Sequence, residues 1–268
     1  MYATKELSLA DTRRLLEYKR DGAFGASFGL KGFDYPWILQ ARRWEPGERV
    51  LDIGAGYSPL PAHLAQTYGC EVWAVDDFGI RSDEPFWTRG KEPQDHIHAN
   101  PEVRYVLERL GDPDRSSLPA GSFDCIYSAS TLEHVPNDLL GDVWRHMDLL
   151  LRPGGEMLHA VDLIVPCDRG LRHWILSWGF EVGLPIVPRR LRIKHARKTA
   201  RVYLWNAFEA LGLPAPRGHG GLDVIRMALD PEVVSEPLEW TFNRMMRDGM
   251  SGIRHGRTAS LLIHLRKQ

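Results

Sequence analysis

Apolar residues occur along much of the chain in short runs, separated by segments of helical periodicity. The run Arg49–Ile53 leads into a glycine turn, and Glu71–Val75 follows one helix-length segment later. Short apolar runs bounded by turns are typical of strands buried on both faces of a parallel sheet. We predict strands over residues 49–53, 71–75, 103–110, 123–128, 156–161 and 258–265, with a further one over 222–229.

Between these runs, apolar residues recur every third or fourth position, which predicts helices. The clearest are residues 59–68 and 138–151, and 5–20 shows the same spacing. A shorter helix is expected to begin near Tyr35 and to end before Pro46. Alternation of strands and helices predicts an α/β fold: a doubly wound, mostly parallel seven-stranded sheet with helices on both faces.

The alternation also divides the chain into four parts. We predict N-terminal helices and a glycine-rich lid in residues 1–47, a Rossmann-like core in 48–164, an inserted cap in 165–221, and C-terminal strands that complete the sheet in 222–268. The cap is placed where the strand and helix pattern stops and a basic run begins.

Composition excludes some classes of protein. A net charge of −1 over 268 residues gives no general attraction to nucleic acid, so we do not expect DNA or RNA as a partner. Three cysteines without a CxxC pair argue against disulfides or a zinc ribbon and favour a reducing, cytoplasmic location. His96 and His98 stand at strand spacing without a third ligand nearby, so we predict no metal site.

The stretch VLDIGAGYSP, residues 50–59, carries the clearest chemistry. Gly54 and Gly56 let a ligand approach the backbone at the start of a helix, where unpaired amides point outward. Dinucleotides and S-adenosylmethionine both use such a turn, and Asp76 stands where an acid would reach a ribose. Pro59 replaces a third glycine and Asp52 would repel a pyrophosphate, which favours S-adenosylmethionine over NAD.

Four ordered segments, VLDIGAG, VWAVDD, SLPAGSFDCIYSASTLEHVPN and LLLRPGG, span residues 48–162. Together they resemble the class I, Rossmann-like S-adenosylmethionine-dependent methyltransferases, in a small-molecule branch similar to the quinone-biosynthesis enzymes. The resemblance implies S-adenosylmethionine as cofactor. An NAD-dependent oxidoreductase or epimerase, and a catalytically silent cofactor-binding subunit, are the alternatives.

The resemblance also implies roles for individual residues. The two glycines would pass under the methionine moiety, an acid beside them would balance its charge, and acids after the second strand would bind the ribose. Either of two acids in GDPDRSSLP would contact the adenine amino group. The cofactor-binding residues expected in this way are Asp52, Gly54, Gly56, Ser58, Asp76, Asp77, Asp112, Asp114 and Ser128.

On the acceptor side, His134 lies where the family contacts substrate. It would act as a general base if the acceptor is a hydroxyl, or else would bind the backbone or position the cofactor. Tyr35, next to the glycine-rich segment, would help to close over the site. We expect methyl transfer to an oxygen, ahead of nitrogen or carbon, of a small or carrier-linked metabolite.

Residues 188–201, PRRLRIKHARKTAR, form a basic run without an acid, in which Arg189 and Arg190 are candidates for substrate binding. Three interpretations stay open. The run would attract a phosphate- or carboxylate-bearing acceptor, rest on an anionic membrane surface, or form a solvated basic helix that packs on the domain.

Overall fold

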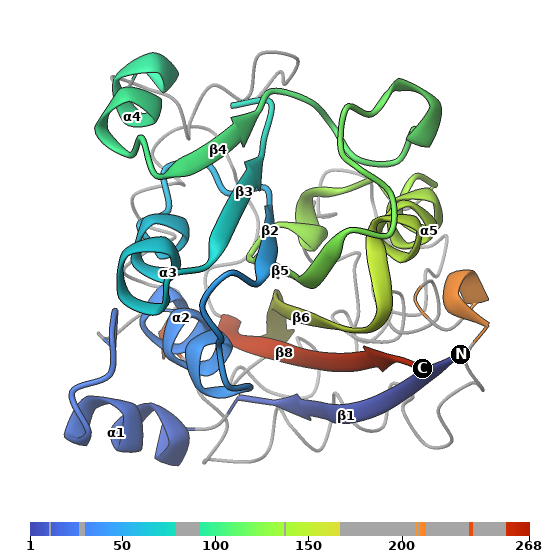
Figure 1. Cartoon of the computed structure of the whole chain (residues 1–268). Coiled ribbons are helices and arrows are strands. Elements are labelled where there is room, and N and C mark those ends of the chain that lie inside the picture. Colours follow the sequence, from blue (N-terminus) through green and yellow to red (C-terminus); the bar gives the residue numbers. More distant parts are fainter. Residues whose placement is uncertain are drawn as a thin grey trace.

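The chain folds into a mixed β-sheet with helices on both faces (Figure 1). The computed structural model describes residues 1–10, 12–26, 30–78, 92–136, 138–166, 207, 209–212, 236–237 and 256–268. The strands are β1 (Tyr2–Leu9), β2 (Arg49–Ile53), β3 (Glu71–Val75), β4 (Val103–Val106), β5 (Phe123–Ala129), β6 (Leu151–Pro166), β7 (Glu236–Pro237) and β8 (Gly256–Lys267). The helices are α1 (Thr12–Arg20), α2 (Leu30–Gln40), α3 (Leu60–Tyr68), α4 (Pro93–Ala99) and α5 (Leu140–Leu150), with 3₁₀ turns η1 (Pro113–Arg115) and η2 (Leu132–His134).

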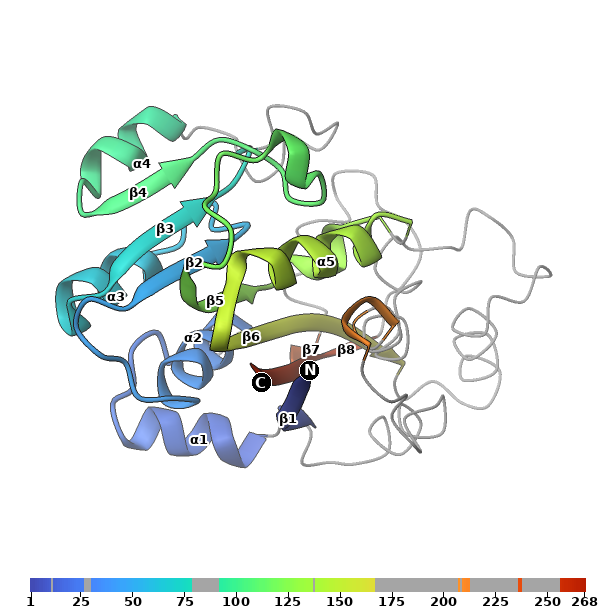
Figure 2. The ribbon, with the colours of Figure 1, turned by 45° about the vertical axis from the view of Figure 1, so that its right-hand side comes forward.

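Seven of the described strands follow one path across the sheet, β1-β8-β6-β5-β2-β3-β4, and β7 pairs with β8. The pairs from β6 to β4 are parallel, whereas β8 is antiparallel to both β6 and β1. The two chain ends therefore lie side by side (Figures 1 and 2). The predicted doubly wound, mostly parallel sheet is confirmed.

The central strands β2 and β3 match their predicted ranges residue for residue. All but the first residue of each is buried, as expected for parallel strands covered on both faces. One hydrophobic cluster fills the face under α5, and a second fills the face under α1, α2 and α3. α3 ends at Gly69, whose φ of 71° is the left-handed conformation that glycine adopts most easily.

The predicted helix over residues 5–20 is wrong in its first half. Residues Tyr2–Leu9 form β1, which pairs with β8 at the other end of the chain, and the helix begins only at Thr12. Helical spacing was a local signal. The pairing with β8 binds the backbone groups of these residues across the sheet and overrides it.

Other boundaries also differ from the prediction. β6 begins at Leu151 and continues through the glycine-rich turn as an irregularity in its pairing with β5. β4 is shorter than predicted, and His96 and His98 lie on α4 instead of at strand spacing. Residues 222–229 and nearly all of 165–221 lie outside the described residues, and so do Arg189 and Arg190. In the described part of the chain, no helix has the length and apolar character that crossing a membrane requires.

Candidate active site

The carboxyl ends of β2 to β6 lie along one edge of the sheet, because these strands run parallel (Figure 2). The strand order reverses at β2, which has β3 on one side and β5 on the other. In open α/β sheets, ligands bind at the carboxyl edge beside such a reversal. The glycine turn after β2 stands at this point.

The turn is held closely between its neighbours. The Gly54 N–H donates to the carbonyl of Val75 at 2.8 Å, and the Thr131 hydroxyl donates to the Gly54 carbonyl at 3.3 Å. Gly54 has a φ of +67°, and a Cβ there would lie 2.2 Å from Thr131 Cγ2. A side chain would therefore be strained and would collide with the segment that follows β5.

Asp76, at the carboxyl end of β3, is joined directly to this turn. Its Oδ2 accepts a hydrogen bond from the Gly56 N–H at 2.7 Å, and its Oδ1 accepts one from the Phe78 N–H at 2.5 Å. Burial raises the pKa of Asp76, although these two donors act to lower it. Asp77 forms an ion pair with Arg109. The structure thus joins the Asp76 carboxyl directly to the glycine turn.

Ser58 and Tyr35 meet beside the same turn. Ser58 Oγ accepts a hydrogen bond from the Leu60 N–H at 3.2 Å and shares another with the Tyr35 hydroxyl. Phe24, from the predicted lid, stacks on the ring of His63 in α3 with a centroid distance of 4.0 Å. α2 and the segment before it therefore cover α3 and the turn, and Tyr35 lies on the predicted cofactor side.

Asp52 is buried in β2, with 3% of its surface exposed, between Ala74 of β3 and Tyr127 of β5. Burial raises the pKa of its carboxyl to about 7, while Tyr127 and Lys31 act to lower it. At neutral pH this carboxyl is close to its midpoint of ionisation, so a nearby cation would shift it to the charged form.

A second set of polar side chains, which the sequence did not predict, lies at the ends of β5 and β6. The Ser130 hydroxyl lies 3.1 Å from Asp34 Oδ2 and 2.8 Å from Asp162 Oδ1. Ser260, on β8, donates to Asp34 Oδ1 at 2.5 Å, and the Lys31 ammonium donates to the Ala129 carbonyl at 2.6 Å. Burial, and then Asp162, raise the pKa of the fully buried Asp34 to about 7.

The predicted base His134 lies in η2 beside a more deeply buried acid. Glu133 is 2% exposed, and within the described residues neither of its carboxyl oxygens has a hydrogen-bond partner. His134 Nε2 lies 3.9 Å from Glu133 Oε1, and a third of the His134 side chain is exposed. Burial, followed by the charge of Asp162, raises the pKa of Glu133 well above its usual range.

Ser128, Asp112 and Asp114 complete the predicted cofactor-binding residues. Ser128 is fully buried and its Oγ lies 2.8 Å from Nδ1 of His159, so it faces the core. Asp112 and Asp114 are exposed around η1, where Asp112 pairs with Arg115 at 3.4 Å. Across the described residues, no group of three His, Cys, Asp or Glu side chains has a metal-binding arrangement.

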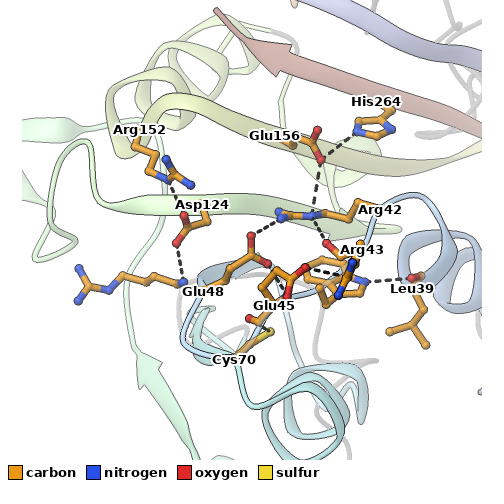
Figure 3. A network of polar contacts seen from close by, with 12 residues as sticks. Leu39, Arg42, Arg43, Glu45, Glu48, Cys70, Asp124, Arg152, Glu156 and His264 are labelled. Atoms are coloured by element: carbon orange, nitrogen blue, oxygen red, sulfur yellow. Dashed lines mark hydrogen bonds and ion pairs between the residues drawn. The ribbon is translucent and has the colours of Figure 1, made fainter.

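The opposite, amino edge of the sheet carries a network of paired charges (Figure 3). Arg42 reaches between Glu48, with which it forms a close ion pair, and Glu156, which lies 3.6 Å away. Glu156 also pairs with Lys5 and lies 3.4 Å from His264 Nε2. An open cavity of about 280 Å³ adjoins these side chains.

The chain is similar to several known proteins. The profile of a methyltransferase domain matches residues 11–213. Ubiquinone biosynthesis O-methyltransferases from Vibrio parahaemolyticus and Erwinia tasmaniensis are 25% and 26% identical to this chain over 174 and 175 residues. Those alignments cover 63% of this chain, and 65% and 63% of the two relatives, so the chain spans slightly less than two thirds of their length. Haemonchus contortus phosphoethanolamine N-methyltransferase 2, solved with S-adenosyl-L-methionine, is 14% identical with a TM-score of 0.44, covering 94% of this chain and 56% of that one.

Proposed function

We propose, because the chain belongs to the methyltransferase-domain family, that it transfers a methyl group from S-adenosylmethionine to an oxygen of a small-molecule acceptor. The main support is the hydrogen bond between the Gly56 N–H and Asp76 Oδ2, which holds the Asp76 carboxyl against the glycine turn. This turn has no room for a side chain at Gly54. An exposed backbone beside a fixed carboxylate suits an adenosyl ligand.

The residues of the turn fit this cofactor. Gly56 leaves space beside Asp76, because among the described residues a Cβ there would meet only Asp76 Oδ2, at 3.9 Å. Asp76 would accept hydrogen bonds from the ribose hydroxyls while its backbone donors hold it in place. Asp52 would ionise beside the ligand's positive charge. When bound, S-adenosylmethionine supplies a methyl carbon activated by the sulfonium, so the protein's main task is to align the acceptor.

Oxygen as the acceptor atom is supported by the similarity to ubiquinone biosynthesis O-methyltransferases. His134, with its exposed portion, is the side chain we propose to take the hydroxyl proton. A carrier-linked or anionic acceptor, and contact with a membrane surface, rest on the basic run at 188–201. That run lies outside the described residues, so these remain predictions from the sequence.

Calorimetric titration of the purified chain with S-adenosylmethionine, S-adenosylhomocysteine and NAD tests the proposal. We expect micromolar binding of the two adenosyl ligands and no heat with NAD, because Asp52 and Pro59 disfavour a pyrophosphate at the turn. Binding of NAD alone would overturn the assignment. If the adenosyl ligands bind, a screen of hydroxyl and amine acceptors then identifies the methylated atom.

A further inference from the structure

The acidic cluster consists of Asp34, Glu133 and Asp162, and Lys31 lies beside it. It is adjacent to the glycine turn, because Thr131 contacts that turn and stands two residues before Glu133. The cluster is assembled from α2, η2 and β6, three elements far apart in the sequence. Its members are therefore brought together by the fold at the edge where the cofactor is proposed to bind.

The contacts around Ser130 suit a proton on the cluster. Its hydroxyl has one hydrogen, but its oxygen lies within hydrogen-bond distance of both Asp34, at 3.1 Å, and Asp162, at 2.8 Å. Both contacts are full two-centre hydrogen bonds when one carboxyl is protonated and donates to Ser130 Oγ; otherwise the two carboxylates share the one hydroxyl hydrogen. The remaining charge of the pair is balanced by Lys31, whose pKa is raised by Asp162 and Asp34 even though desolvation acts to lower it.

Glu133 shares the charge of Lys31 with Asp34 and Asp162, and His134 Nε2 lies 3.9 Å from its Oε1. Glu133 is 2% exposed, and no hydrogen bond reaches either of its carboxyl oxygens from the described residues. A buried carboxyl without a partner is costly whether it is charged or neutral. The ionisable groups around Glu133 are Lys31, Asp34, Asp162 and His134, and Asp52 and Tyr35 lie beyond them around Lys31.

We propose that the acidic cluster binds a cationic group of a ligand held at the glycine turn, with Glu133 as its main contact, and that the cation displaces a proton from the cluster to solvent. The proposal rests on the proposed function, since that supplies the ligand. A sulfonium or an ammonium has the required chemistry. The sulfonium of the cofactor and an amine of the acceptor are the two sources.

Proton release measures this exchange directly. The full chain is titrated calorimetrically at pH 7.5 in two buffers of different ionisation enthalpy. The ligands are S-adenosylmethionine, sinefungin, which carries an amine in place of the reactive methyl, and S-adenosylhomocysteine, which has the same amino-acid end but no charge at the transfer centre. If the cofactor is the source, the first two ligands release protons and the third does not. If the acceptor is the source, titration of dimethylethanolamine into the S-adenosylhomocysteine complex releases them instead.

Variants assign the effect to the cluster. Glu133→Gln should abolish most of the proton release. It should also weaken the affinity for the cationic ligand on the order of tenfold relative to that for S-adenosylhomocysteine. Asp34→Asn should also reduce the release, and it provides a second test if Glu133→Gln does not fold. Glu17→Gln removes an exposed charge from α1 and should leave both quantities unchanged.

The outcomes separate the two proposals. Proton counts that are equal for ligands with and without a charge at the transfer centre, and unchanged in Glu133→Gln and Asp34→Asn, with no release on addition of dimethylethanolamine, would overturn the cation site and leave the proposed function intact. If none of the adenosyl ligands binds, the proposed function fails, and the cation site fails with it.

Discussion

The two edges of the sheet use acidic side chains in opposite ways. At the amino edge, Glu156 is 8% exposed and contacts Lys5, Arg42 and His264, so its charge is compensated (Figure 3). At the carboxyl edge, Asp34 is as deeply buried but contacts two serine hydroxyls and a second acid. Both edges bury carboxyl groups, but Glu156 at the amino edge has three cationic partners, whereas Asp34, Asp52 and Glu133 at the carboxyl edge all depend on the charge of Lys31.

The difference appears in their acidities. Burial would raise the pKa of Glu156, but His264, Lys5 and Arg42 lower it to about 2. Burial raises the pKa of Asp34 and of Asp52 to about 7, and the opposing contacts are too weak to reverse this. A carboxylate that is already paired stabilises the fold. One that is buried and half-protonated costs stability and is available to a ligand, as is common at functional sites.

Glu156→Gln should have the largest effect on stability, because it removes the shared partner of Lys5, Arg42 and His264. Breaking a buried ion pair from one side typically costs about 3 kcal/mol. We expect a loss of this size in the free energy of urea unfolding, with unchanged affinity for S-adenosylmethionine. The exposed pair of Arg20 and Asp21 is the control, since Asp21→Asn should cost less than about 0.5 kcal/mol. Lost cofactor affinity in Glu156→Gln would show that the two edges are not independent.

Gly54→Ala should affect both stability and binding at the carboxyl edge. The new Cβ would lie 2.2 Å from Thr131 Cγ2 at a φ of +67°, so we expect a loss of about 2 kcal/mol and no measurable cofactor binding. Gly47→Ala is a matched control: its φ is +81°, but nothing lies within 4 Å of the new Cβ. It should cost about 1 kcal/mol and leave binding intact. Equal behaviour of the two variants in unfolding and titration experiments would refute the steric argument.

Asp76→Ala should weaken the affinity for S-adenosylmethionine on the order of tenfold or more. It removes a charged acceptor for the ribose hydroxyls and the hydrogen-bond acceptor of the Gly56 N–H. Asp77→Ala removes the neighbouring acid, which pairs with Arg109, and should change affinity much less. Calorimetric titration measures both. If Asp77→Ala loses more affinity than Asp76→Ala, then Asp77 and not Asp76 binds the ribose.

Asp34→Asn should give the smallest effect on stability, visible as a dependence of the unfolding free energy on pH. The pKa of Asp34 is raised to about 7 in the folded protein, so its contribution to stability is fully present below its unfolded pKa of about 3.9 and is lost as pH rises through 7. Asparagine cannot ionise. Relative to the natural chain, the variant should therefore gain about 1 kcal/mol of unfolding free energy between pH 6 and pH 8. A difference that does not change with pH in urea titrations would contradict the raised pKa of Asp34.

Local patterns were sufficient for the central strands and for the glycine turn. β2 and β3 match their predicted bounds because a short apolar run between turns has no stable alternative to burial in the middle of a sheet. Asp76 was predicted beside the turn because two consecutive parallel strands end at the same edge. Neither inference needs information from distant parts of the chain.

Other features depended on contacts between residues far apart in the sequence. Tyr2–Leu9 became a strand because β8 provides its hydrogen-bond partners, and Ser128 faces His159 because β6 lies beside β5. Asp34 and Glu133 looked like ordinary acids in the sequence. Whether a carboxyl is solvated, paired or buried with its proton depends on the neighbours that packing brings around it, and so the amino-acid sequence located the cofactor turn while only the tertiary structure created the acidic cluster.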